Sequence, residues 1–455
     1  MAVTQGNLHL LATGKISRLL WDYSIPAVVG MLVMSLYNVI DRIFIGQGVG
    51  TEAIAGLAIT FPVMNVASAL GVLIGAGASA RVSIYLGANN KRGADLVLGN
   101  ALSVTVAIAA VYISCFYIWL DDILRAFGAS AVSLPYARDF MLHILPGMFI
   151  MNIAFSFNNI MRASGYPIKA MYSMFISAGV NLILAPTFIF ALDMGIKGAA
   201  IATDIAMSVF ALIVMWHFTR PSSALHFKRG TFRPNAATII SIISIGAAPS
   251  IVNLASSAIN VIINKSLYFY GGDNAVAAAG IFTTYGSLLT MIVVGICQGL
   301  QPIIGYNYGA GRLDRLKRAY WLAVAWGTAV VSVGAIGGLT AAPWIARAFT
   351  IDQTLIDVTS RAFHHAFWAF WVVGFQIVST TFFQSIGKAG KSIFLSLARQ
   401  VIFLIPLLLI LPSRMGLDGV WTSFPFSDLL ATAATAIMIF WQFRQIERES
   451  SIRTS

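Results

Sequence analysis

Asp41 is the residue best suited to chemistry in this chain, because it is a carboxylate inside a long apolar stretch, residues 19–46. Met34, Tyr37 and Asn38 precede it by seven, four and three residues, so the four side chains share one face of a helix. A carboxylate at membrane depth is costly and normally faces a cavity or a partner. The spacing therefore predicts a buried acid that gains and loses a proton.

Two residues near Asp41 bear on how it acts. Pro26, early in the same stretch, lacks a backbone N–H and predicts a bend, so we expect it to be a hinge. Arg42 follows Asp41 directly and supports a plainer alternative, an ion pair near the end of the helix. A bent helix that carries an acid favours the first interpretation, a moving part that titrates.

Further polar residues in other apolar stretches are candidates to join Asp41. Thr203 and Asp204 are adjacent in one stretch, and Asn181 lies in the stretch before it. We expect Asp204, Asn181 and Thr203 to converge with Asp41 and Tyr37 on one polar pocket. The alternative for Asn and Thr is a purely structural role, since both residues join membrane helices by hydrogen bonds.

Substrate contacts are expected from polarizable, aromatic and amide side chains, which adapt to varied ligands. The candidates for a substrate cleft are Met34, Tyr37, Asn38, Phe61, Met64, Asn152, Phe155, Asn159, Asn260, Tyr285 and Met291.

The composition requires a membrane protein. The 455 residues are 58% hydrophobic and 10% charged, against about 25% charged in soluble domains. The net charge of +12 does not indicate nucleic-acid binding, because the basic residues sit in turns between apolar stretches. Neither a GxxxxGK[ST] loop nor an HExxH, CxxC or GxSxG motif occurs, so we expect no enzyme, metal or cofactor. Movement must draw on an ion gradient or a partner.

Twelve apolar stretches are long enough to cross a membrane as helices, which needs about 20 residues each. They are residues 17–46, 53–80, 95–120, 135–161, 168–191, 196–218, 237–268, 275–303, 316–343, 358–385, 392–412 and 416–443. Most Lys and Arg residues fall on one side of this arrangement, which predicts that both termini are cytoplasmic.

The two halves of the chain repeat each other at an offset of 222 or 223 residues. Pro26 corresponds to Pro249, and MRASGYPIKAM at 161–171 corresponds to FQSIGKAGKSI at 383–393. Each half has an even number of spans, so the repeats are parallel and an axis along the membrane normal relates them. We expect an all-α fold of two six-helix lobes, 1–218 and 237–455, joined by a basic cytoplasmic linker at 219–236, with a central cleft between the lobes.

These motifs resemble a known family. SIP…YNVIDRIFIG, AIAGLAITFP, RASGYP and GLQPIIGYNYGAGR look like the multidrug and toxic compound extrusion (MATE) transporters, and QPIIGYNYGA is similar to the MepA-type multidrug exporters of the DinF-like branch. The resemblance covers nearly the whole chain. It implies a V-shaped two-lobe fold, antiport of drugs against cations, and a bacterial cytoplasmic membrane.

The resemblance also assigns roles to residues. It matches the helix-one acid to Asp41, the bending proline to Pro26, the helix-five asparagine to Asn181 and the helix-six threonine to Thr203. It thereby implies that Asp41, Asn181 and Thr203, with Asp204, form a site that couples transport to a proton or another cation. One position departs from the pattern: Ala185 stands before Pro186 where many relatives have Asp. This departure makes a compact sodium site doubtful and leaves Asp204 as a substitute acid, although adjacent helical residues point about 100° apart.

The expected function is proton-coupled efflux of amphipathic, often cationic, aromatic drugs or dyes by a monomeric transporter. Sodium coupling is one alternative. Export of a lipid-linked oligosaccharide or a metabolite is another, and it would favour a basic cleft. The sequence offers few candidates for buried basic residues, chiefly Arg42 and Lys265, both near the outer side.

Overall fold

The chain folds into helices that are long enough to cross a bilayer, as a computed structural model shows for residues 2–49, 51–129 and 133–454. In lipid every backbone polar group must be bonded internally, and helices meet this requirement within one segment. Apolar residues fill the spans, and some of the helices begin with a polar residue that caps a backbone N–H. Asn90 accepts from Gly93 N at the start of α4, and Asn235 accepts from Thr238 N at the start of α9.

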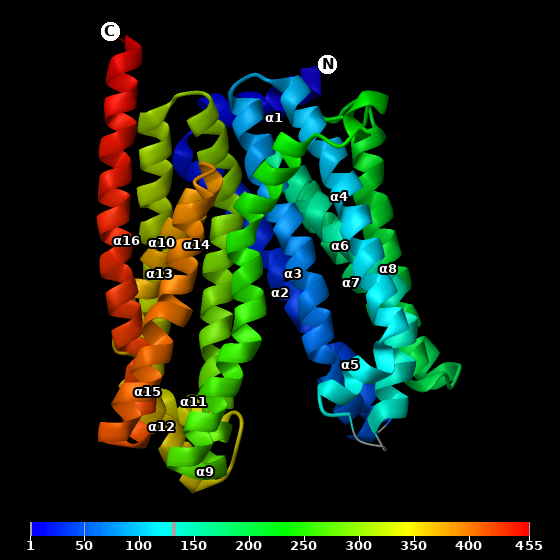
Figure 1. Cartoon of the computed structure of the whole chain (residues 1–455), viewed down its shortest axis with the longest axis vertical. Coiled ribbons are helices and arrows are strands. Elements are labelled where there is room, and N and C mark those ends of the chain that lie inside the picture. Colours follow the sequence, from blue (N-terminus) through cyan, green and yellow to red (C-terminus); the bar gives the residue numbers. More distant parts are fainter. Residues whose placement is uncertain (1, 50, 130–132, 455) are drawn as a thin grey trace.

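The first half of the chain forms one helical bundle (Figure 1). Its helices are α1 (Ala2–Thr13), α2 (Ile16–Gly48), α3 (Thr51–Gly87), α4 (Lys91–Ile118), α5 (Leu120–Ala126), α6 (Ser133–Ala163), α7 (Pro167–Pro186), the π-turn η1 (Thr187–Ala191) and α8 (Gly195–Thr219). A linker with the short 3-10 helix η2 (Arg229–Phe232) leads to the second half.

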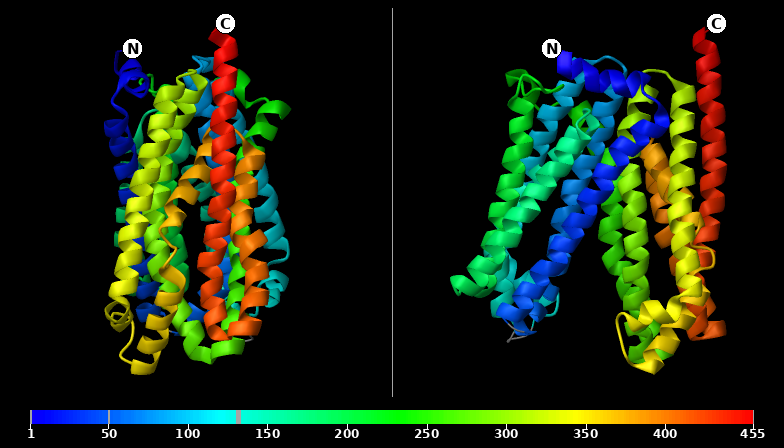
Figure 2. Two further views of the ribbon diagram at one scale, coloured as in Figure 1. Left: turned by 90° about the vertical axis from the view of Figure 1, so that its left-hand side faces the viewer. Right: turned by 180° about the vertical axis from the view of Figure 1, so that it is seen from behind.

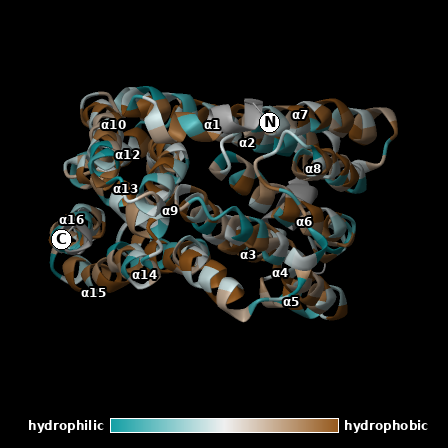
Figure 3. Cartoon of the chain, turned by 90° about the horizontal axis from the view of Figure 1, so that it is seen from above, coloured by the Kyte–Doolittle hydropathy of each residue, from teal (hydrophilic) through white to brown (hydrophobic). Residues whose placement is uncertain are grey.

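The second half forms the other bundle. Its helices are α9 (Ala236–Gly309), α10 (Leu313–Thr340), α11 (Ala342–Arg347), α12 (Gln353–Phe367), α13 (Val372–Ser385), α14 (Ala389–Leu397), the π-turn η3 (Ala398–Phe403), α15 (Leu404–Met415) and α16 (Leu417–Thr454). Seen from the end that bears the termini, α3 and α9 lie between the two sets of helices (Figure 3).

The number of spans agrees with the twelve that the sequence predicts when the bent pair α12 and α13 counts as one span and the broken helix α9 counts as two. Among the described residues, ten helices pass as spans, and the pair α12 and α13, bent by 57°, makes an eleventh. The 74-residue α9 breaks at Gly272, where φ is 66° and ψ is −160°, and its two halves run side by side as two spans (Figure 1).

The predicted repeat is present in the backbone itself. Residues with positive φ occur at corresponding places in the two halves: Asn89 with Gly311, Gly165 with Gly387, and, at an offset one residue shorter, Gly195 with Gly416. The two residues of each pair lie at the end or the start of corresponding helices in the two lobes. The two lobes therefore share a chain path as well as a sequence pattern.

The lobes meet along a seam where glycines allow backbones to touch. A Cβ on Gly87 would lie 2.0 Å from the Tyr306 carbonyl oxygen, and a Cβ on Gly309 would lie 2.0 Å from that of Ile84. These two contacts exchange under the 222-residue offset, so the axis that relates the lobes passes between them. The lobes converge at the end that bears the termini and diverge toward the other end, which gives the V shape (Figure 2, right).

Candidate functional site

A hydrogen-bonded group joins three helices of the amino lobe at the predicted coupling site. Asn181 Nδ2 of α7 donates to Thr203 Oγ1 of α8 at 3.1 Å, and Tyr37 Oη of α2 lies 3.5 Å from the same hydroxyl. The Thr203 hydroxyl donates its hydrogen bond to the Ala199 carbonyl at 3.0 Å. Tyr37 is therefore the donor to Thr203. Tyr37 and Asn181 are both buried, and Thr203 is half-buried.

Asp41 lies one turn beyond Tyr37 on α2. Its Oδ1 is buried and has no hydrogen-bond partner among the described residues. Arg42 is exposed, and no ion pair joins it to Asp41 in the part of the chain that the structure describes. The plainer interpretation, an Asp41–Arg42 ion pair, is thus not realised. A buried acceptor without a partner is open to a proton or a cation.

Asp204 and the adjacent Thr203 face different helices. Its carboxylate lies against α6 at Gly147, where an added Cβ would stand 1.7 Å from Asp204 Oδ1. Ala185, which holds the position of the acid expected from the resemblance, is fully buried in apolar packing. The structure thus brings Tyr37, Asn181 and Thr203 together, and Asp41 lies one turn from Tyr37 on α2. Asp204 faces α6, and its Oδ1, like that of Asp41, is buried without a hydrogen-bond partner among the described residues.

Several residues expected in the substrate cleft take part in packing within the lobes. Asn152 Nδ2 donates to Tyr112 Oη at 2.7 Å, and Phe155 packs edge-on against Phe210 with ring centroids 5.4 Å apart. Tyr285 Oη donates to the Gly334 carbonyl at 2.8 Å. These contacts favour a purely structural role for the three residues. Their contact with substrate stays a prediction.

The other cleft candidates differ in exposure. Met34 is buried, and Asn38 is exposed with its amide bonded to the Met34 carbonyl at 2.8 Å. The exposed candidates are Phe61 and Asn260, and the half-buried ones are Met64, Asn159 and Met291. Their assignment to a cleft also stays a prediction.

Sequence reasoning missed a set of polar contacts that cross between the lobes. Arg162, at the end of α6, donates to Gln298 of α9, and Gln301 Nε2 donates to the Ala76 carbonyl at 3.1 Å. Ser24 Oγ of α2 donates to the Ile296 carbonyl at 3.3 Å. A signal existed for Arg162, because the repeat places Gln384 at its position and so marks it as specific to one lobe.

Arg162 also corrects the expectation about buried basic residues. Arg42 and Lys265 are exposed, whereas Arg162 is only 4% exposed. Its guanidinium contacts the amide oxygens of Asn158 at 3.1 Å and Asn159 at 3.5 Å in addition to Gln298. The expectation was wrong because it judged depth from position in a span and not from contact between the lobes.

Two parallel helical repeats, with polar groups buried inside membrane spans, define the class of two-lobe membrane transporters. The chain belongs to the MatE family, whose profile matches residues 26–187 and 249–410, one match per lobe. It is therefore a multi-pass membrane transporter and not an enzyme.

The relatives agree over almost their full length. The multidrug export protein MepA of Staphylococcus aureus (strain MRSA252) is 24% identical over 436 residues, 95% of each chain. An FAD transporter of Shewanella oneidensis is 27% identical over 431 residues, 93% of this chain and 94% of that one. A multidrug resistance MATE transporter in an outward-facing conformation has a TM-score of 0.90 and 25% identity, covering 97% of this chain and 99% of that one.

Proposed function

We propose that the protein exports amphipathic, cationic, aromatic compounds in exchange for protons, by alternating access across a bacterial cytoplasmic membrane. The observation that carries this proposal is Asp41, whose Oδ1 is buried without a partner beside the Tyr37–Thr203–Asn181 group. MepA, a relative over 95% of the chain, is a multidrug export protein. No bound cofactor enters this proposal, and the transporter is taken to act as a monomer.

The proposed cycle uses charge at Asp41 as the switch. When ionised, Asp41 attracts a cationic compound or leaves a polar site that a cation can enter. Protonation removes the charge, so the substrate loses its attraction and the cost of burying an ion disappears. Helix α2 then changes its bend at Pro26, which lies inside the continuous helix Ile16–Gly48. With both termini in the cytoplasm, the diverging ends of the lobes face outside.

Two alternatives are kept because particular observations favour them. A sodium ion would use the same oxygens of Asp41, Asn181 and Thr203, although Ala185 supplies no carboxylate. An anionic cargo would fit the buried Arg162, which contacts amide oxygens and forms no ion pair among the described residues, and one relative is an FAD transporter. The cationic proposal is preferred because Asp41, with its buried and partnerless Oδ1, lies one turn from Tyr37 of the three-helix polar group.

Everted membrane vesicles provide the test. Ethidium accumulation driven by an imposed pH gradient in sodium-free buffer is the expected result. Accumulation that requires sodium and ignores the pH gradient would contradict proton coupling. Transport of FAD but not of ethidium would contradict the substrate class. An otherwise identical vesicle preparation without the protein is the control for passive dye movement.

A further inference from the structure

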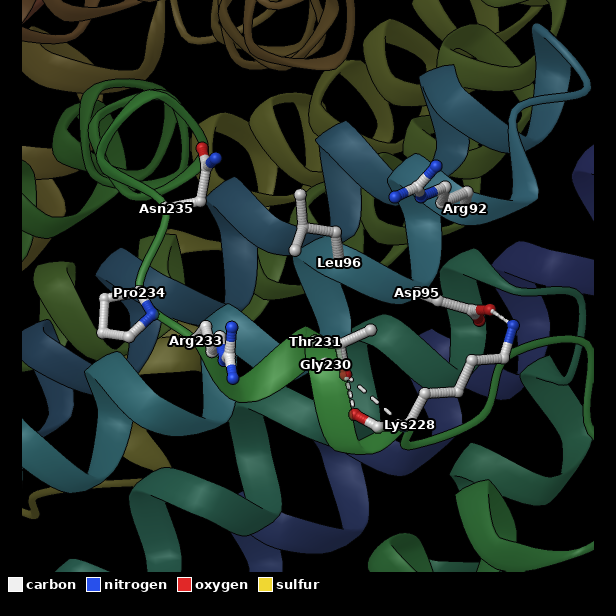
Figure 4. Close-up of a pocket in the computed structure, with 9 residues that line it drawn as sticks. All are labelled: Arg92, Asp95, Leu96, Lys228, Gly230, Thr231, Arg233, Pro234 and Asn235. Atoms are coloured by element: carbon white, nitrogen blue, oxygen red, sulfur yellow. Dashed lines mark hydrogen bonds and ion pairs between the residues drawn. The ribbon is translucent and has the colours of Figure 1, made fainter.

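A basic cavity lies where the linker between the lobes meets α4. It has a volume of about 550 Å³ and is lined by Arg92, Asp95, Leu96, Lys228, Gly230, Thr231, Arg233, Pro234 and Asn235 (Figure 4). None of these residues belongs to the coupling site or to the contacts between the lobes. The cavity is large enough for a small ligand, since binding pockets commonly measure about 300 to 1,000 Å³.

The charges of the cavity are unbalanced. Lys228 Nζ and Asp95 Oδ2 form an ion pair at 2.5 Å, so the single acid is already satisfied by one base. Arg92 and Arg233 are exposed and form no ion pair within the described part of the chain. Figure 4 shows them on opposite sides of the cavity, while Lys228 turns toward Asp95. Two guanidinium groups are therefore left to attract an anion.

The wall that carries Arg233 is rigid. Asn100 Nδ2 donates to the carbonyls of Thr231 at 3.0 Å and Arg233 at 3.3 Å, and Asn100 Oδ1 accepts from Asn235 N at 2.8 Å. Gly99 lets the linker approach, because a Cβ there would stand 2.4 Å from the Thr231 carbonyl oxygen. The loop is thus held against α4 before any ligand binds, which lowers the entropic cost of binding.

The location indicates the kind of anion. The cavity lies between the first turn of α4 and the residues just before α9, and both helices enter the apolar layer from there. With the linker on the cytoplasmic side, as the proposed orientation requires, the cavity lies near the level of the bilayer phosphates, where basic pockets hold anionic headgroups. Guanidinium groups suit phosphate because their planar fork of donors matches its oxygens.

We propose that this cavity is a phosphate-binding site, formed by Arg92 and Arg233 and backed by Lys228, which takes the phosphate of an anionic lipid headgroup or a free phosphate. Its ligand bridges α4 and the linker that leads to the second lobe, and so adds to the hydrogen bonds of Asn100 that already join them. The proposal does not rest on which compounds are transported.

The test compares two double variants with the same loss of charge. Arg92→Gln with Arg233→Gln removes the two guanidinium groups of the cavity. Lys91→Gln with Arg229→Gln removes two exposed neighbouring charges that do not line it. Asp95, Lys228 and Asn100 are left intact, so the linker keeps its anchors. Single variants of Arg92 and Arg233 cover the case in which the cavity double variant is poorly folded.

Thermal unfolding of the purified full-length protein is the readout, with short-chain phosphatidylglycerol, phosphatidylcholine of the same chain length, or inorganic phosphate added. We expect phosphatidylglycerol to raise the Tm of the wild type and of the Lys91/Arg229 variant, with affinity for it about tenfold weaker in the Arg92/Arg233 variant. Stabilisation by phosphatidylglycerol alone identifies the lipid headgroup, and stabilisation by inorganic phosphate as well identifies free phosphate.

The proposal is overturned if both double variants respond to phosphatidylglycerol equally, because the effect would then come from general surface charge. It is equally overturned if phosphatidylcholine stabilises the wild type as strongly as phosphatidylglycerol, or if no anion changes the Tm.

Discussion

In the amino lobe, Asp41 and Arg162 carry charges of opposite sign, and neither has an ionic partner among the described residues. They serve different purposes. Asp41 stands beside the Tyr37–Thr203–Asn181 group, whereas Arg162 reaches across to Gln298 in the other lobe. Asp41 and Arg162 form no ion pair with each other, so neither charge is neutralised by the other. Arg162 bonds the side-chain amides of Asn158, Asn159 and Gln298 instead.

The Thr203 hydroxyl accepts from both other members of the polar group, so we predict that Thr203→Val lowers the rate of export about tenfold. Loss of the hydroxyl leaves the buried Asn181 and Tyr37 without their shared partner, which costs about 1–3 kcal/mol. Dye efflux from cells with equal amounts of protein is the measurement. Ser208→Ala on the same helix is the control, because the Ser208 hydroxyl bonds only the Asp204 carbonyl. Equal efflux in both variants would exclude Thr203 from the site.

The sequence located this site only in part. Helical spacing places Asp41 and Tyr37 on one face, and the resemblance adds Asn181 and Thr203. Spacing within one helix does not tell which neighbour that helix will pack against. For this reason the contacts of Asn152 with Tyr112 and of Arg162 with Gln298 were not foreseen.

Helix α3 carries the seam between the lobes, and its glycines decide how closely α9 approaches. A Cβ on Gly77 would lie 1.9 Å from the Ile242 carbonyl oxygen, and one on Gly246 would lie 1.6 Å from that of Leu73. A composition rich in glycine predicts close packing in general. Only the structure shows that these glycines keep the two backbones in contact at the end that bears the termini.

We predict that Gly77→Ala opens the seam at this end, since the added methyl group has backbone as its neighbour and cannot be accommodated by a side-chain shift. Spin labels at the exposed positions Lys91 and Asp314, in a variant without Cys115 and Cys297, should report a longer distance. Gly179→Ala is the control, because a Cβ on this helical glycine meets nothing within 4 Å. An unchanged distance distribution in Gly77→Ala would show that the seam is not needed for closure.

At the scale of the whole molecule, the two lobes share a backbone but differ in chemistry. The match of the MatE profile to both halves and the paired residues with positive φ establish the repeat. The sequence predicted the spans and the two lobes because membrane helices are set by long apolar stretches. It predicted no particular contact between the lobes, because those contacts depend on side chains far apart in the chain.

One ion pair is repeated with its polarity reversed. Asp95 at the start of α4 pairs with Lys228 of the linker, and Lys317, at the corresponding position of α10, pairs with Glu447 of α16. In both lobes the start of the third span is thus tied to the segment that follows the sixth. The Asp95 side chain is 1% exposed, while that of Glu447 is 58% exposed.

We therefore predict unequal effects on stability. Asp95→Asn should destabilise the protein by about 1–2 kcal/mol, because a buried carboxylate loses its charge beside Lys228, whose own half-exposed position limits the loss. Glu447→Gln should leave the Tm unchanged within error. Thermal unfolding of both variants in detergent is the measurement, and a larger effect of Glu447→Gln would refute the account.

The central claim is that Asp41 exchanges a proton for a cationic substrate, and proton release on binding tests it most directly. Tetraphenylphosphonium, a cation that does not titrate, is added to purified protein in weakly buffered solution that contains a pH-sensitive dye. The account predicts proton release from the wild type and none from Asp41→Asn, with the same unfolding behaviour in both proteins. Equal proton release from both would contradict it.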